Sequence, residues 1–210
     1  MTIDPAAEAD PPVEQVLLDS LLYSVSHDLR SPLLTMSLSA ELIEAALEGA
    51  GSSADLAINS LRQGAVDMER MLQTLMVLSR ARRKTLEPAR GALQMILGGR
   101  LVVSEADLSH RIALVDPLHV CEVLDAAAEE GPLEVHVRLD GARAELAFDL
   151  ARLEHGPTPL HAVCASLKQY AGTAVEALAV GQVLLERQGA SVRGTDGRVT
   201  IMLPLAGGDI

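Results

Sequence analysis

The stretch LDSLLYSVSHDLRSPLLTMSLSAELIEAAL, Leu18–Leu47, decides the fold of the N-terminal part of the chain. Its apolar positions recur at steps of three or four residues: Leu18, Leu22, Val25, Leu29, Pro32, Met36, Ala40, Ile43 and Leu47. This spacing is typical of the seam of a helix that packs along its length against other helices. We therefore expect one long helix here.

A second helix is expected after GAGSS, Gly49–Ser53, which offers a helix stop and a new N-cap. Its apolar seam reads Ala54, Ile58, Leu61, Ala65, Met68, Leu72 and Leu75. Two helices joined by a short turn form an antiparallel hairpin, and a hairpin alone cannot bury two seams of this length. The simplest partner is a second copy of the chain, so the sequence predicts a homodimer built on a four-helix bundle.

Composition narrows the classes of partner. The 210 residues include 17 Lys and Arg against 29 Asp and Glu, and the resulting net charge of −12 repels nucleic-acid phosphates and anionic lipid. Residues 1–12 look like a disordered polar leader, and no run reaches the roughly 18 apolar residues that span a bilayer. We expect a cytoplasmic protein with two reduced, buried thiols, Cys121 and Cys164, that binds neither nucleic acid nor a membrane.

Short alternating runs and glycine turns begin after Glu87 and Pro88, so we place the helical hairpin in residues 13–86 and a second domain in residues 87–210. The second domain is expected to contain helices over 89–97, 117–130 and within 161–188, with strands at 111–115, 133–139, 142–150, 190–193 and 198–203. The GTDG sequence before the last strand is a hairpin-turn signal. This order predicts a two-layer α/β sandwich and an α+β fold overall.

His27 is the first candidate functional residue. Heptad lettering with Leu22 and Leu29 at a and Val25 at d puts His27 at f, the position that faces water. An exposed imidazole offers a nucleophilic nitrogen, and the neighbouring Asp28 can orient the ring or take its proton. Pro32 lacks an N–H and leaves the carbonyl of Asp28 without its helical donor, which predicts a bend just after the histidine.

The segment SHDLRSPL, Ser26–Leu33, resembles the phosphoacceptor box of sensor histidine kinases, and the hairpin resembles that family's dimerisation and phosphoacceptor domain. By this resemblance His27 is the residue that becomes phosphorylated, Asp28 is its general base or orienter, and Arg30 is a nearby cation. Ser31 stands where family members with phosphatase activity often carry Thr or Asn, which leaves phosphatase activity open.

The second half resembles the ATP-binding α/β domain (Bergerat type) of the same family, through VDPLHVCEVL, Val115–Leu124, and through Ala177–Leu205. That family binds Mg-ATP with an asparagine on the helix expected at 117–130, but the single asparagine of this chain, Asn59, lies in the hairpin. The Asp-x-Gly-x-Gly motif is missing, and only Gly181 remains of the glycine-rich phosphate turn. The resemblance implies a degenerate domain without ATP binding or a metal site, with magnesium supplied by the response regulator.

These observations favour a histidine phosphotransferase of a two-component phosphorelay, which carries a phosphoryl group between response-regulator aspartates through His27 without ATP hydrolysis. The receiver domains of the regulators are expected to dock near Tyr23, Arg30 and Leu34. Two alternatives stay open: a soluble sensor histidine kinase with a divergent ATP site, and a non-catalytic dimeric regulator of two-component proteins.

Overall fold

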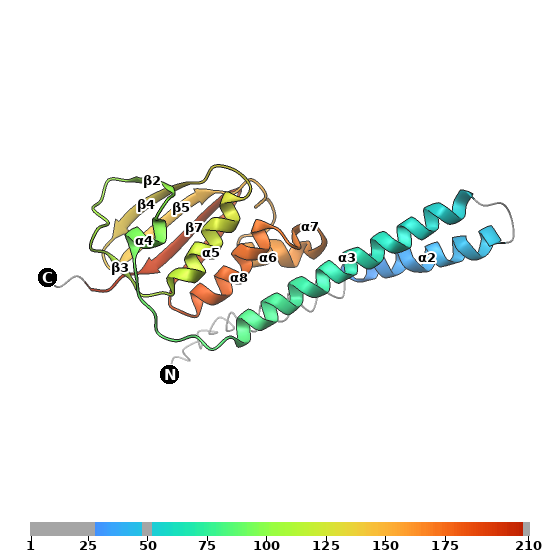
Figure 1. Ribbon diagram of the computed structural model, residues 1–210, viewed down its shortest axis with the longest axis horizontal. Coiled ribbons are helices and arrows are strands. Elements are labelled where there is room, and N and C mark those ends of the chain that lie inside the picture. Colours follow the sequence, from blue (N-terminus) through green and yellow to red (C-terminus); the bar gives the residue numbers. More distant parts are fainter. Residues whose placement is uncertain (1–27, 48–51, 208–210) are drawn as a thin grey trace, which may run out of the picture.

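The computed structural model describes residues 28–47 and 52–207, and its N-terminal part is a helical hairpin (Figure 1). Helix α2, Arg30–Leu47, is followed by the longer α3, Ser52–Arg83. The buried and half-buried side chains of α2 fall on one face: Pro32, Met36, Ser39 and Ile43. This face confirms the described part of the predicted helix and its seam positions Pro32, Met36 and Ile43. The seam positions Leu18, Leu22 and Val25 lie outside the described residues, as does the side chain of Leu47.

One seam position of α2 was assigned wrongly. Ala40 is exposed, and Ser39 is buried in its place. The steps from Met36 to Ser39 and from Ser39 to Ile43 are three and four residues, which keeps the heptad spacing that Ala40 breaks. Ser39 was not predicted as a seam residue because it is polar, and the seam was identified from apolar residues alone.

The C-terminal part is built on a five-stranded mixed sheet of order β2-β4-β5-β7-β6. Strands β2 and β4 pair in parallel and the other neighbours pair antiparallel. Two further strands, β1 and β3, form a small antiparallel pair. The strand bounds are β1 Gly91–Ala92, β2 Leu101–Ser104, β3 Ile112–Ala113, β4 Glu134–Asp140, β5 Arg143–Asp149, β6 Ser191–Thr195 and β7 Arg198–Pro204.

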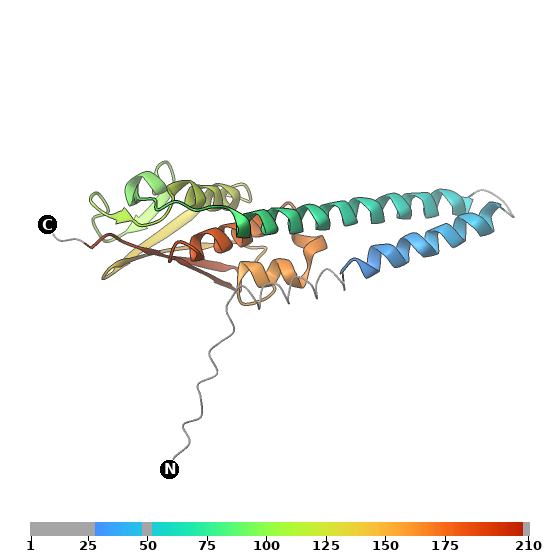
Figure 2. The same cartoon turned by 90° about the horizontal axis from the view of Figure 1, so that it is seen from below.

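The helices of this part lie against one face of the sheet (Figures 1 and 2). Their bounds are α4 Leu93–Leu97, α5 Pro117–Ala128, α6 Pro159–Ala165, α7 Leu167–Tyr170 and α8 Ala174–Glu186. A helical hairpin followed by a mixed sheet with helices is the predicted α+β fold, and its helix and sheet layers match the predicted sandwich. Within the described ranges, no helix is both long and apolar enough to cross a bilayer.

The inner face of the sheet is apolar because the strands alternate. A row of buried side chains crosses four neighbouring strands in register, from Val137 through Leu146 and Ile201 to Val192. The turn between β6 and β7 has Asp196 and Gly197 at positive φ, 52° and 79°, as a two-residue hairpin turn requires. The turn predicted from GTDG is therefore confirmed.

Several element boundaries differ from the sequence-based expectation. The long helix expected within 161–188 is three helices, because Ser166 leaves the helical region at φ −155° and ψ 74° and Gly172 turns the chain at φ 71°. The helix expected over 89–97 is only α4, preceded by β1. Strand β2 was not predicted, since four residues are too short for a clear alternation.

The hairpin and the second part share one core. Met71, Leu78 and Ala81 of α3 belong to the same cluster of buried side chains as Leu178 and Leu185 of α8. The C-terminal half of α3 consequently runs alongside the helices of the α/β part, while the tip of the hairpin projects away from it (Figures 1 and 2).

Candidate functional site

The candidate site begins at the start of α2. His27 and Tyr23 lie outside the described residues, and Asp28 is the first residue that the structure describes. A turn at Leu29 separates Asp28 from α2, and the amide of Leu33 donates to the carbonyl of Leu29 at 3.2 Å. Pro32 has no amide hydrogen to offer the carbonyl of Asp28. The bend at Pro32 stays a prediction, because one residue before the turn does not define a helix axis.

Pro32 lies at a close approach of α2 and α3. It is buried, and a Cβ added to Gly64 of α3 would lie 3.4 Å from the carbonyl oxygen of Pro32 and 3.2 Å from Cγ of Met36. Gly64 thus lets the two helices pack tightly at this level. Arg30, Ser31 and Leu34 are exposed on the other side of α2, as residues available to a partner must be.

Asp28 contacts the α/β part of the chain. Its Oδ2 accepts a hydrogen bond from the backbone amide of Leu167, the first residue of α7, at 3.2 Å. Asp28 is half-buried and makes a further interaction as well. The acid next to the candidate phosphoacceptor is therefore held by a residue 139 positions away, a contact that the sequence does not signal.

Polar contacts fasten α3 to the second part at several levels. Asp67 Oδ2 lies 2.5 Å from Nζ of Lys168 on α7, and Thr74 Oγ1 donates to Glu176 Oε2 of α8 at 2.7 Å. Near the end of α3, Arg187 donates to the carbonyl of Ala81 at 2.9 Å. The second part is therefore fixed to the same helix that packs against α2.

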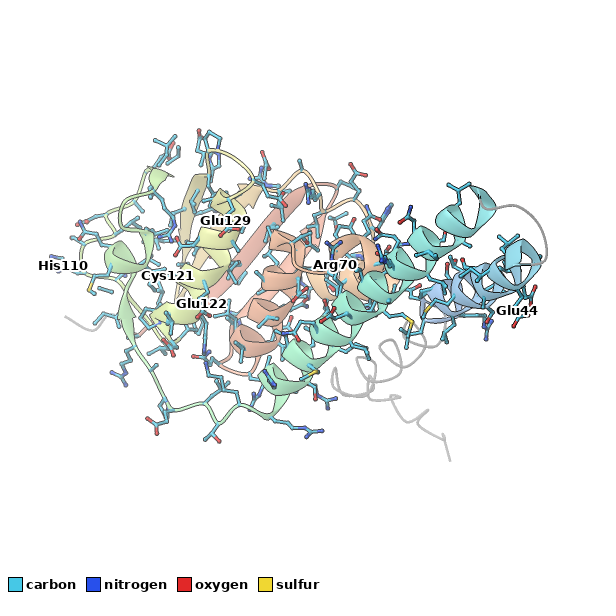
Figure 3. The ribbon with its side chains drawn as sticks, turned by 45° about the vertical axis from the view of Figure 1, so that its right-hand side comes forward. Glu44, Arg70, His110, Cys121, Glu122 and Glu129 are labelled. Carbon is cyan, nitrogen blue, oxygen red and sulfur yellow. The ribbon has the colours of Figure 1, made fainter. Side chains whose placement is uncertain are left out.

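A pocket of about 300 Å³ lies between α3, α5 and α8. Its charged and titratable lining residues are Glu122, Glu176 and His119, and apolar side chains such as Val77 and Leu184 complete the walls. Figure 3 shows Glu122 on α5, well away from Glu44 near the tip of the hairpin. The lining offers carboxylates and an imidazole, but no amide side chain of the kind that binds Mg-ATP in the family that this chain resembles.

The glycine that remains from the expected phosphate turn has a packing role. Gly181 lies within α8 rather than at its start, and a Cβ there would come 2.1 Å from Cγ2 of Val123 on α5. Gly181 allows α5 and α8 to approach each other, and its amide is part of a helix rather than of an open phosphate loop. This corrects the expectation that Gly181 is a remnant of a turn.

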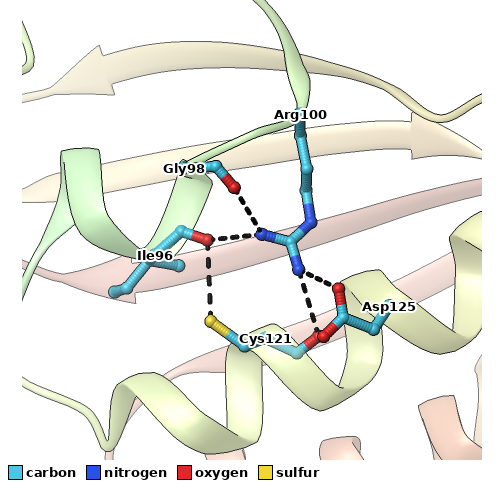
Figure 4. Close-up of polar contacts among 5 residues, drawn as sticks. All are labelled: Ile96, Gly98, Arg100, Cys121 and Asp125. Carbon is cyan, nitrogen blue, oxygen red and sulfur yellow. Dashed lines mark hydrogen bonds and ion pairs between the residues drawn. The ribbon is translucent and has the colours of Figure 1, made fainter.

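The side of α5 that faces α4 is also occupied by structural contacts (Figure 4). Arg100 donates to the carbonyl of Ile96 at 2.9 Å, which caps the end of α4, and it pairs with Asp125 of α5. Cys121 Sγ lies 3.6 Å from the same Ile96 carbonyl. Cys121 and Cys164 are both free thiols; Cys164 is buried as expected, but Cys121 is only half-buried.

His119 is buried at the junction between the end of α3 and α5. Its Nε2 lies 2.9 Å from Nζ of Lys84, and its Nδ1 lies 2.9 Å from the side-chain nitrogen of Gln188. Burial, and then the charge of Lys84, lower the pKa of His119 below its ordinary value, against the opposing effects of Asp116 and Glu122. His119 is therefore neutral at pH 7. Through Lys84 and Gln188 it connects the segment after α3 with the segment after α8.

Metal-type clusters were not expected from the sequence. Among residues 28–47 and 52–207, no group of three or more His, Cys, Asp or Glu side chains is arranged to hold a metal ion.

Comparison with known protein families adds an assignment for the hairpin. The family described as "His Kinase A (phospho-acceptor) domain" matches residues 17–84. This segment is a His Kinase A domain. The match covers the SHDLRSPL box and the whole α2–α3 hairpin, so this assignment applies to the hairpin and not to the rest of the chain.

Three solved structures are similar over most of the chain. Histidine kinase AdeS of Acinetobacter baumannii is 16% identical, with 85% of this chain and 97% of that chain covered and a TM-score of 0.40. A structure described as a bacterial phosphotransferase is 15% identical, with 97% and 98% covered and a TM-score of 0.33. A histidine kinase from Burkholderia phymatum STM815 is 15% identical, with 93% and 94% covered and a TM-score of 0.37.

At such identities and TM-scores these likenesses carry no conclusion about activity. No curated protein matches the chain significantly.

Proposed function

We propose that this protein is a histidine phosphotransferase of a two-component phosphorelay, which receives a phosphoryl group from one response regulator on His27 and passes it to another. The observation that carries the proposal is the match of residues 17–84 to a phospho-acceptor domain that contains the SHDLRSPL box. Receiver domains of response regulators are the proposed partners. The cytoplasmic location stays a prediction from the sequence.

The lining of the pocket supports transfer without ATP. Glu122 and Glu176 would oppose the phosphates of a nucleotide, and Gly181 packs inside α8 instead of forming a phosphate loop. The pocket lacks the side-chain amide and the open glycine turn with which the family that this chain resembles binds Mg-ATP, so we derive no step through a nucleotide. We propose instead that the phosphoryl group and its magnesium ion arrive with the regulator.

The proposed chemistry balances without a further reactant. The unprotonated imidazole nitrogen of His27 attacks the phosphorus of a regulator's aspartyl phosphate, so that a P–N bond forms as the P–O bond breaks and the aspartate carboxylate leaves. Positive charge develops on the ring, whose other nitrogen carries the proton. Asp28 accepts a hydrogen bond from that N–H or takes its proton, and the reverse sequence loads the second regulator.

Exposed apolar residues on the hairpin support the proposed homodimer. Apart from Leu34, large side chains that remain exposed in the single chain include Leu33, Leu38 and Leu42 of α2 and Ile58 and Leu72 of α3. Two of them, Ile58 and Leu72, occupy positions of the predicted α3 seam. Apolar residues at seam positions need a helical partner, and a second copy of the same hairpin supplies one of matching length.

The deciding experiment mixes the full-length protein with one phosphorylated receiver domain in the absence of nucleotide and follows label on His27 over seconds. We expect label on the wild-type protein, none on His27→Gln, and wild-type labelling on the control His161→Gln, since His161 is an exposed residue of α6. Label retained by His27→Gln would overturn the proposal.

Two further arms separate the alternatives. Labelled ATP with magnesium and no receiver labels His27 only if the protein is a histidine kinase. A phosphorylated receiver that binds the wild-type protein but transfers nothing to it identifies a non-catalytic regulator. Loss of label from phosphorylated wild-type protein into a second, unphosphorylated receiver completes the expected relay.

A further inference from the structure

Helix α7 connects the second part of the chain to the acid beside the candidate phosphoacceptor. Its first residue, Leu167, is fully buried and donates its amide hydrogen to Oδ2 of Asp28. Its last residue, Tyr170, is also buried. The side chain between them that reaches the hairpin is that of Lys168.

Lys168 pairs with a buried carboxylate on α3. Asp67 is 4% exposed, and its two oxygens bind Nζ of Lys168 at 2.5 Å and Nε2 of Gln63 at 2.9 Å. Burial alone would raise the pKa of Asp67, but hydrogen bonds from Lys168 and Gln63 together lower it below its ordinary value. Asp67 therefore stays ionised, and its charge is met by Lys168.

The two contacts of α7 act on neighbouring residues. The Lys168 side chain binds α3, and the Leu167 amide, one residue earlier, binds Asp28 at the start of the paired helix. A helix of four residues has few backbone hydrogen bonds of its own, so its orientation depends on its side-chain contacts: Leu167 and Tyr170 pack in the core, and Lys168 binds α3. The position of the Leu167 amide is consequently linked to the Lys168–Asp67 pair.

We propose that Lys168 is a positioning residue for phosphoryl transfer: its pairing with Asp67 places the Leu167 amide where it orients the carboxylate of Asp28, the residue that follows His27 in the sequence. This inference rests on the function proposed above and gives the second part of the chain a role in it. Lys168 touches neither the phosphoryl group nor His27 in this scheme. It acts through α7 and Asp28.

The effect of Lys168 should be visible only while Asp28 is present. Acid–base assistance of the kind assigned to Asp28 contributes about 10²- to 10⁴-fold to a rate, and misorientation of the group loses part of that factor. We expect Asp28→Asn to slow the transfer from a phosphorylated receiver by about 100-fold or more. We expect Lys168→Met to slow it by about tenfold, as a fraction of that contribution.

The test is a double-mutant cycle on the rate of label transfer to His27 at saturating receiver. If Lys168 acts through Asp28, then Asp28→Asn with Lys168→Met transfers as slowly as Asp28→Asn alone, within about twofold. Lys168→Arg keeps the charge and should restore most of the wild-type rate. Gln169→Met, on the exposed residue that follows, is the matched control and should transfer as the wild type does.

A second measurement does not depend on activity. In ¹H–¹⁵N spectra of the dimer-competent full chain, the Leu167 amide resonance should move in Asp28→Asn and move in Lys168→Met, while Gln169→Met leaves it in place. Circular dichroism and light scattering of each variant check that secondary structure and oligomeric state are kept.

The possible outcomes separate the two proposals. If the wild-type protein takes no label, the phosphotransferase function fails, whatever Lys168 does. If the wild type is labelled but Lys168→Met transfers at the wild-type rate, or slows Asp28→Asn by the same factor as it slows the wild type, the positioning role is wrong. An unmoved Leu167 resonance in Lys168→Met overturns it as well.

Discussion

Replacement of Leu78 by Ala tests whether the hairpin and the second part form one cooperative unit. Leu78 lies on α3, is 0% exposed, and belongs to the same core cluster as Leu178 and Leu185 of α8. The substitution removes about three carbon groups at about 0.8 kcal/mol each and leaves a cavity that adds to the loss. We expect the free energy of unfolding to fall by about 3 kcal/mol, within the usual range for buried leucines.

The assay is thermal unfolding followed by circular dichroism and by calorimetry, at one fixed protein concentration because dimer dissociation also shifts Tm. For a chain of this size a loss of about 3 kcal/mol lowers Tm by about 6–12 °C. Leu56→Ala is the matched control, since Leu56 is on the same helix and is 72% exposed. Its Tm should change by about 2 °C or less.

A different result would refute the reasoning in one of two ways. If Leu78→Ala melts within about 2 °C of Leu56→Ala, the side chain does not belong to the core. If the protein melts in two separate transitions and only the transition of the hairpin moves, the two parts do not share the core that their contacts indicate.

Two further predictions follow from the hairpin and from His119. Leu72→Glu places a charge on the proposed dimer face, so multi-angle light scattering should show monomers, and a dimer of wild-type stability would contradict the bundle. The pKa of His119 is lowered in the folded state, so the unfolded state binds the proton more readily once the pH falls below about 6.5. The free energy of unfolding is therefore highest above that pH and decreases as the pH is lowered further. Urea unfolding between pH 5 and 8 should show this slope, and His119→Gln should reduce it; an equal slope in the variant would exclude His119 as its source.

The hairpin was predictable because its pattern is local and repeated. Seam residues such as Met36 and Ile43 recur at helical spacing, and the next helix repeats the pattern. Some predicted seam positions are exposed in the single chain, namely Ala40 of α2 and Ile58, Ala65 and Leu72 of α3, but the helical hairpin does not depend on any one of them. The β6–β7 turn was equally local, since Asp196 and Gly197 adopt the positive φ angles that their residue types favour.

Features that depend on tertiary contact were not predictable in the same way. The breaks between α6, α7 and α8 occur at Ser166 and Gly172, inside a stretch whose apolar content reads as one helix. The hydrogen bond from Leu167 to Asp28 joins residues with no pattern in common, and only the docking of α7 on α3 brings them together. The need for a glycine at position 181 likewise arises from a tertiary contact, because Val123 of α5 packs against that position.

The attachment of the second part to α3 has a mechanical consequence. Asp67 and Ala81, which bind Lys168 and Arg187, are 14 residues apart and hence about 21 Å apart along the helix axis. Because the α/β part is attached to α3 at two such distant points, it cannot rotate about either of them. Any twist or tilt of α3 must therefore move the whole α/β part as a rigid body. In the proposed dimer, each α/β part would then keep a fixed orientation relative to the four-helix bundle. A regulator would dock beside an α/β part whose position is already set.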